Sequence, residues 1–181
     1  MLLAVAPLCQ RAQAADLPPA KQAIFLVRVF AYDANLKERA GEAVNIAVLA
    51  KKGDKDSEHV AGLMVKAFTP LESATLLGLP VRISRLYFST REVLDHTVRA
   101  GGIDALYVCK GLDTNLADIK AVARARKVLT VGNQEAQLMQ GLTLGVFLID
   151  GKNTIIVNLE ASREEGVAFG PELLRLATIV R

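Results

Sequence analysis

The alternation of two apolar patterns along the chain constrains its fold more than any other feature of the sequence. Apolar-rich runs of strand length occupy residues 44–50, 81–88, 103–109 and 128–131. Between them, apolar residues recur at helical spacing over residues 20–31, 57–67, 90–98 and 116–123. Strands that alternate with helices pair in parallel through right-handed crossovers. The pattern therefore predicts a parallel sheet covered by helices.

The end of the chain adds a different pattern. Two strand-like runs, residues 144–149 and 154–158, flank Asp150-Gly151. This dipeptide is a strong hairpin signal because both residues tolerate positive φ. We therefore expect a Rossmann-like three-layer α/β domain whose mixed sheet combines parallel strands with a C-terminal antiparallel hairpin.

Several helix boundaries can also be predicted. Ser57 and Thr90 are suitable N-cap residues for the helices that follow them. Gly170-Pro171 is expected to begin a last helix, because proline is favoured at the first helical position. The apolar stripe of that helix would consist of Leu173, Leu176, Ala177 and Val180.

Residues 1–14 are interpreted as the end of a secretory signal peptide. Met1 to Leu8 is apolar, and Ala12-Gln13-Ala14 matches an A-x-A cleavage pattern. The basic start of such a peptide is missing, which a start codon assigned too late would explain. The alternative interpretation is the N-terminal segment of a cytosolic protein. Cleavage after Ala14 would leave a single α/β domain over residues 15–181.

Cleavage would also change the charge and the cysteine content. Loss of Arg11 lowers the net charge from +3 to +2, and loss of Cys9 leaves Cys109 as the only cysteine. An intramolecular disulfide is then excluded. No later stretch approaches the roughly 20 apolar residues of a transmembrane helix. We therefore expect a periplasmic protein that is not inserted in the membrane.

Positive charge is interspersed with negative charge along the chain. The densest basic run, Arg124, Arg126 and Lys127, is typical of a helix C-terminus. A nucleic-acid-binding protein would show a broader basic face or a recognisable docking element. Nucleic-acid binding is therefore not expected.

The sequence contains no motif that indicates catalysis. His59 and His96 lie on predicted helices away from the apolar stripe, and we interpret them as surface histidines rather than metal ligands. The chain has no G-x-S-x-G elbow, no G-x-G-x-x-G fingerprint and no P-loop. We expect neither an enzyme nor a cofactor or metal site.

Five residues lie at the carboxyl ends of two neighbouring predicted strands. They are Cys109, Lys110 and Gly111 at the end of one strand, and Gly132 and Asn133 at the end of the next. Open α/β sheets bind ligands outside the carboxyl ends of their strands. These residues are therefore a candidate ligand or partner cleft. The alternative is that they form ordinary turns and that Cys109 is a small buried hydrophobe.

Four segments resemble the YfiR family of periplasmic regulators over about residue 20 to the C-terminus. They are Gly78-Leu79-Pro80-Val81, Val128 to Gly132, Asn158 to Ser162, and the predicted closing helix between Gly166 and Val180. Redox-regulated members of that family use cysteine pairs, which the mature chain would not have. The resemblance implies a Rossmann-like periplasmic protein that is often dimeric.

The resemblance also implies a function. The best-understood members of the family bind the periplasmic sensor domain of an inner-membrane diguanylate cyclase and hold the enzyme inactive, which lowers cyclic-di-GMP signalling. A protein of that kind would be a non-enzymatic regulator. The alternative function is a periplasmic module that binds a small ligand in the strand-end cleft near Gly111 and Asn133.

Overall fold

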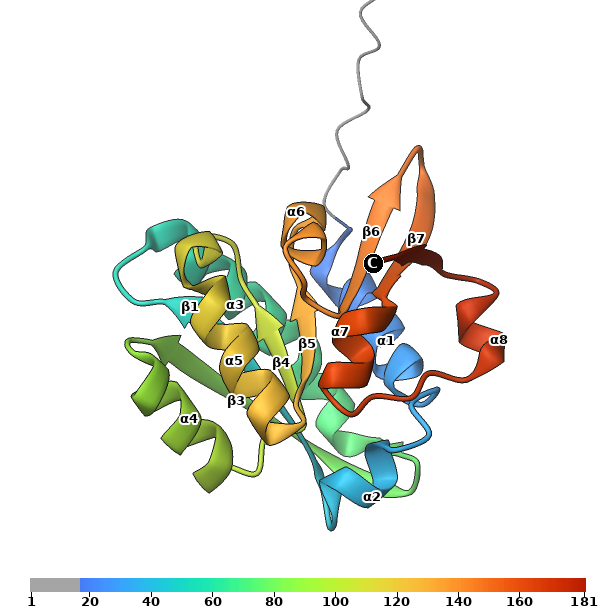
Figure 1. The fold of residues 1–181 in the computed structure, drawn as a ribbon, viewed down its shortest axis with the longest axis horizontal. Helices are drawn as coiled ribbons and strands as arrows, with labels where there is room; N and C mark the ends of the chain where they lie inside the picture. Colours follow the sequence, from blue (N-terminus) through green and yellow to red (C-terminus); the bar gives the residue numbers. More distant parts are fainter. Residues whose placement is uncertain (1–16) are drawn as a thin grey trace, which may run out of the picture.

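The computed structural model describes residues 17–181, and the predicted signal peptide with Cys9 and Arg11 lies outside this range. One eight-stranded sheet runs through the molecule in the order β2-β3-β1-β4-β5-β6-β7-β8 (Figure 1). The strands are β1 Val44–Lys51, β2 Thr75–Leu76, β3 Leu79–Phe88, β4 Ala105–Val108, β5 Leu129–Gly132, β6 Leu144–Ile149, β7 Lys152–Asn158 and β8 Thr178–Val180. Only the β2–β3 and β6–β7 pairs are antiparallel, so the predicted mixed sheet is confirmed.

Eight α-helices lie within residues 17–181, and the first two of them precede β1. They are α1 Pro19–Phe30, α2 Leu36–Ala40, α3 Lys55–Phe68, α4 Arg91–Ala100, α5 Leu116–Arg126, α6 Glu135–Met139, α7 Leu159–Glu164 and α8 Pro171–Leu174. Two 3₁₀ turns, η1 Thr69–Ser73 and η2 Asp113–Asn115, precede β2 and α5. Over this part of the chain, no helix combines the length and the apolar character needed to cross a bilayer.

The central strands are buried on both faces. In β1, Ile46 and Val48 point into the core beneath α1 and α3, whereas Ala47 and Leu49 point into the core beneath α4 and α5. Successive side chains of a strand alternate between faces, so a run that is apolar at every position must be covered on both sides. Figure 1 shows these two helix pairs on opposite faces of the sheet. The predicted three-layer architecture is therefore correct.

The hairpin and one of the two predicted caps are confirmed. Asp150 and Gly151 have φ of 50° and 72°, as a tight turn between β6 and β7 requires. The Thr90 hydroxyl accepts a hydrogen bond of 3.4 Å from the Val93 amide at the start of α4. The Ser57 prediction is wrong. Asp54 caps α3 instead, because its Oδ1 accepts from the amides of Asp56 and Ser57 at 3.1 and 3.0 Å.

The last helix begins at Pro171 with Gly170 as its N-cap, as predicted, but its predicted extent to Val180 is wrong. The helical turn of α8 ends at Leu174, and Thr178–Val180 forms β8, which pairs in parallel with residues 156–158 of β7. Leu173 is buried, but Leu176 is 73% exposed and cannot belong to a common buried stripe. Thr178, Ile179 and Val180 are all β-branched, and such residues favour a strand once a neighbouring edge is available.

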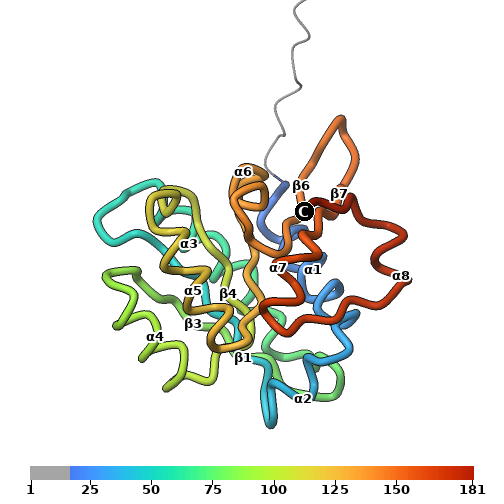
Figure 2. Tube along the Cα trace, in the orientation of Figure 1, coloured from blue at the N-terminus to red at the C-terminus, as the bar shows by residue number. Residues whose placement is uncertain are grey.

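The segment between α7 and α8 joins the C-terminal part of the chain to the end of α1 (Figure 2). Asp33 and Phe169 form an isolated antiparallel bridge. The amide of Ala34 donates to the carbonyl of Ala168, and the amide of Gly170 donates to the carbonyl of Tyr32, both at 2.9 Å. The segment that follows α1 is thus hydrogen-bonded to the segment that precedes α8.

Candidate functional site

A pocket of about 170 Å³ lies beside the carboxyl end of β4, between the start of α1 and α3. Its apolar lining comes from Leu17, Pro18 and Pro19 at the start of α1, from Val60, Leu63 and Met64 of α3, and from Phe147 of β6. Three polar residues complete it: Gln22, Tyr107 and Asn133. None of these ten residues carries a charge.

The three polar residues form a continuous hydrogen-bonded chain. Asn133 Nδ2 donates to the Tyr107 hydroxyl at 3.0 Å, and that hydroxyl donates to Gln22 Oε1 at 2.9 Å. Gln22 Nε2 in turn donates to the carbonyl of Val146 at 3.0 Å. Asn133 Oδ1 accepts from the amide of Lys110 at 3.2 Å. Each end of the chain is anchored to backbone, so the positions of the three side chains are fixed.

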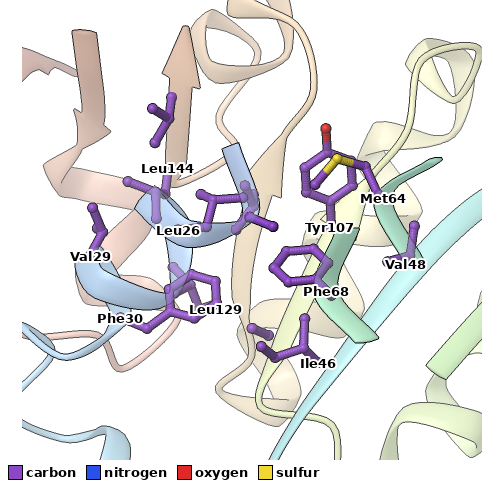
Figure 3. Close-up of a cluster of buried hydrophobic side chains, with 14 of the residues drawn as sticks. Leu26, Val29, Phe30, Ile46, Val48, Met64, Phe68, Tyr107, Leu129 and Leu144 are labelled. Atoms are coloured by element: carbon purple, nitrogen blue, oxygen red, sulfur yellow. The ribbon is translucent and has the colours of Figure 1, made fainter. Parts of the chain in front are cut away.

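Packing of the aromatic ring reinforces this arrangement. The ring of Tyr107 meets the ring of Phe68 edge to face, with centroids 6.3 Å apart and an interplanar angle of 76°. Met64 lines the same pocket as Tyr107. In Figure 3 the Tyr107 hydroxyl points away from Phe68. Met64, Phe68 and Tyr107 are all almost completely buried. The hydroxyl is therefore held at the pocket by a rigid apolar base.

Two of the five residues proposed from the sequence are enclosed in the core. Cys109 has no exposed surface, and burial raises the pKa of its thiol to about 12, so it is not a reactive thiolate. Gly132 is buried against α6. A Cβ on Gly132 would lie 2.4 Å from Leu138 Cδ1, so this glycine allows α6 to pack closely.

Two further residues of the set tie the loop after β4 to the start of α3. Gly111 has φ of +84°, and a Cβ there would lie 2.8 Å from Asp54 Oδ2. The Lys110 ammonium is 3.5 Å from Asp56 Oδ2, and both side chains are exposed. The space over Gly111 is thus occupied by the neighbouring loop.

Asn133 is the member of the predicted set that lines the pocket. The structure joins it to Lys110 through the hydrogen bond to the Lys110 amide. Gln22, Tyr107 and Phe147 were not predicted. The available signals were Gln22 on the buried face of a helix, four residues before Leu26, and Tyr107 as the one aromatic residue of an otherwise aliphatic strand. Neither signal indicates which other residues lie next to Gln22 or Tyr107 in the folded protein.

Titratable groups elsewhere do not converge on this pocket. His59 and His96 are both exposed, on α3 and α4. Glu165 is fully buried beyond the end of α7, where its carboxylate accepts from the Thr130 amide and from the hydroxyls of Thr130 and Thr143. Burial raises the pKa of Glu165 to about 7. Within residues 17–181, no three His, Cys, Asp or Glu side chains are grouped so as to hold a metal ion.

Solved structures of similar fold include one with bound L-Trp and one of a substrate-binding protein. The ABC domain from Streptococcus pneumoniae in complex with L-Trp has a TM-score of 0.62 at 12% identity, covering 91% of this chain and 60% of that chain. A substrate-binding protein with adhesive properties from Clostridium difficile, in a ligand-free, open structure, has a TM-score of 0.57 at 15% identity, covering 81% and 57%.

A conserved domain protein from Vibrio cholerae gives a TM-score of 0.63 at 12% identity, covering 92% of this chain and 62% of that chain. This chain therefore spans about three fifths of the length of the solved chains that it matches. At these identities the likeness concerns the fold alone.

Sequence comparison gives a more specific match. The model of a family described as YfiR/HmsC-like matches residues 21–178. None of the curated protein sequences matches the chain. The matched range begins in α1 and ends at the first residue of β8, so it contains nearly all of the described domain.

Proposed function

Because the chain belongs to the YfiR/HmsC-like family, we propose that it is a non-enzymatic periplasmic regulator that represses an inner-membrane diguanylate cyclase. It would bind the periplasmic sensor domain of the cyclase and thereby lower cyclic-di-GMP signalling. The family match over residues 21–178 is the observation that carries this proposal. Export of the protein through the predicted signal peptide, residues 1–14, is part of it.

Repression of this kind is a shift between two states of the cyclase. The regulator can hold the enzyme inactive only if it binds the inactive state more tightly than the active one. Moving the population from about 99% active to about 99% inactive requires a difference in affinity of roughly 10⁴-fold. A signal that weakens binding to the inactive state would release the enzyme.

The surface of the domain offers apolar side chains for such an interface. Large apolar side chains that are more than a third exposed occur on both helices and strands: Ile24, Tyr32, Leu63, Leu77, Tyr87, Val93, Met139, Leu176 and Ile179. The central part of a protein–protein interface is enriched in apolar and aromatic residues. These positions are therefore the first candidates for contact with a sensor domain.

A genetic experiment with a biochemical readout tests the proposal. Deletion of the gene is expected to raise cellular cyclic-di-GMP, and the full-length gene in trans should restore the lower level. Crosslinking of the exported protein in intact cells should recover a membrane protein with a cyclase output domain. An unchanged cyclic-di-GMP level together with no recovered membrane partner would refute the proposal.

A site-specific version of the crosslinking locates the surface. A photoreactive phenylalanine analogue is placed singly at each exposed apolar position, with the exposed polar positions Lys52 and Glu160 as matched controls. We expect crosslinks to the partner from a contiguous subset of apolar positions and none from the controls. Equal crosslinking from all positions would indicate chance encounters rather than an interface.

Self-association is a second part of the proposal. Strand β8 is the last strand of the sheet, and no described strand pairs with its outer edge. Ile179 on this strand is 37% exposed, and Leu176 just before it is 73% exposed. Unprotected edge strands tend to pair with another chain. Light scattering should therefore report a dimer for the parent protein and a monomer for Ile179→Lys. A monomeric parent protein would exclude self-association.

A further inference from the structure

We propose that the pocket between α1 and α3 binds a small, uncharged molecule with an apolar body and one hydrogen-bonding group. This inference rests on the pocket alone and does not depend on the proposed repression of a cyclase. It identifies the type of ligand from the charge, size and hydrogen-bonding groups of the pocket.

The absence of charge among the lining residues indicates that the ligand is uncharged. None of the ten side chains that line the pocket is ionised, and seven of them are apolar. A charged ligand would lose much of its hydration on entry without gaining an opposite charge. An uncharged molecule does not pay this desolvation cost, so the pocket selects against ions.

The volume decides the second property. The pocket measures about 170 Å³, and an apolar protein cavity of about 150 Å³ is large enough to bind benzene. A single ring or a compact aliphatic group therefore fits, whereas two fused rings with substituents would exceed the space. Met64 and Phe147 would contact the apolar body of the ligand.

The side-chain amide of Asn133 indicates that the ligand carries a hydrogen-bonding group. Its Nδ2 group carries two hydrogens, and the hydrogen bond to Tyr107 uses one of them. Asn133 is half-buried, so it can be reached from outside. Because Oδ1 is held by the Lys110 amide at 3.2 Å, the amino group keeps a fixed direction. It can donate to a hydroxyl or carbonyl oxygen of a ligand that lies in the pocket.

The polar groups are also prearranged. Gln22 is 6% exposed and Tyr107 is 1% exposed, and both are hydrogen-bonded within the protein. A ligand would therefore not have to order these side chains, which reduces the entropic cost of binding. Neutral polar groups at one end of a mostly apolar, preformed pocket are typical of small-molecule sites.

Three probes of one size separate the properties. Phenol has a ring and a neutral hydroxyl, benzene has the ring alone, and benzoate carries a negative charge. In an NMR titration with phenol, we expect the side-chain amide signals of Gln22 and Asn133 to shift in a saturable manner. Benzene should bind more weakly than phenol, and benzoate at least tenfold more weakly. Benzoate binding as tightly as phenol, or phenol shifts confined to other residues, would overturn the proposal.

A matched pair of substitutions tests the location. Val60 lines the pocket and is half-buried on α3, so Val60→Phe places a ring in the pocket. Val93 is 51% exposed on α4 and lines no part of it, so Val93→Phe is the control. Phenol affinity should fall at least tenfold in Val60→Phe and stay unchanged in Val93→Phe. Retained affinity in Val60→Phe would overturn the assignment.

A third variant covers the case in which Val60→Phe does not fold. Asn133→Ala removes the donor while leaving the apolar walls in place. Phenol should then lose its advantage over benzene, and the two should bind with affinities equal within about twofold. A persistent preference of this variant for phenol would exclude Asn133 as the recognising group.

Discussion

The hydroxyl of Tyr107 donates a hydrogen bond of 2.9 Å to Oε1 of Gln22, which lies 85 residues earlier in the chain. This bond joins a central strand to the first described helix at the edge of the pocket. It also continues to Asn133, whose amide donates to the same hydroxyl. The polar end of the pocket and the packing of α1 on the sheet are therefore parts of one network.

Removing the hydroxyl should destabilise the fold. Tyr107→Phe leaves Gln22 Oε1 and Asn133 Nδ2 without their shared partner, and unsatisfied buried polar groups cost about 1–3 kcal/mol. We expect the free energy of unfolding in urea to fall by about 2 kcal/mol. Tyr87→Phe is the control, because Tyr87 is 44% exposed and should change stability by less than about 0.5 kcal/mol. Equal losses in both variants would contradict the role assigned to the network.

Local patterns in the sequence were sufficient for most of the fold. The buried run at 44–50 and the dipeptide Asp150-Gly151 each specify their own conformation, because the signal lies within a few residues. The segment 173–180 shows where this fails. Its apolar spacing fits a helix, but pairing of Thr178–Val180 with β7 outweighs that local preference.

The pocket could be predicted only in part for a related reason. The carboxyl ends of β4 and β5 were expected to meet, and Asn133 does lie there. Gln22 and Phe147 come from α1 and β6, and no local signal in the sequence indicates that these elements approach the same point. Only the packing of α1 against the sheet brings them together.

Substitution by alanine should lower the stability of the protein at Gly132 and raise it at Gly62. Gly132→Ala would place a Cβ 2.4 Å from Leu138 Cδ1 within the core, and such overpacking costs about 1–3 kcal/mol. Gly62 lies inside α3, where a Cβ would meet only the Arg85 guanidinium at 3.0 Å, which is the end of a flexible side chain. Gly62→Ala should therefore stabilise by about 0.5–1 kcal/mol. Thermal and urea unfolding of both variants will check the signs, and a loss of stability in Gly62→Ala would show that Arg85 cannot move.

The ion pair of Asp33 and Arg39 should contribute more to the free energy of unfolding than the exposed ion pair of Asp95 and Arg126. Asp33 Oδ2 lies 2.6 Å from Arg39 Nη2, and the aspartate side chain is fully buried. Asp33 Oδ1 also accepts from the amides of Asn35 and Ala168 at 3.1 and 2.9 Å, which holds the segment before α8 in place. Breaking a buried pair by removing one partner costs about 3–5 kcal/mol. We expect a loss of this size in Asp33→Ala.

Asp95→Ala is the control for that prediction. Asp95 pairs with Arg126 at 2.6 Å, but both side chains are about one third exposed. Exposed ion pairs contribute little to stability because water and salt screen them. The measurement is urea unfolding of both variants at low and high salt. A larger loss of unfolding free energy in Asp95→Ala than in Asp33→Ala would show that the exposed pair, and not the buried one, stabilises the fold.

Glu165 should make stability depend on pH near neutrality. Burial raises the pKa of its carboxyl from an ordinary 4.5 to about 7, although hydrogen bonds from Thr130 and Thr143 oppose the shift. The folded protein thus binds a proton between these two pH values where the unfolded chain has already released it. Stability therefore falls as the pH rises from about 4.5 to about 7, and this contribution is on the order of 2–3 kcal/mol.

A neutral side chain at position 165 should remove this dependence. In Glu165→Gln, the decrease in unfolding free energy between pH 5 and pH 8 should be smaller than in the parent by most of that amount. Glu164→Gln is the matched control, since its side chain is 40% exposed and pairs with Arg124 at the surface. The measurement is urea unfolding of the three proteins at both pH values. If Glu165→Gln and the parent show the same change with pH, the buried carboxyl titrates outside this range and its hydrogen bonds, rather than burial, set its pKa.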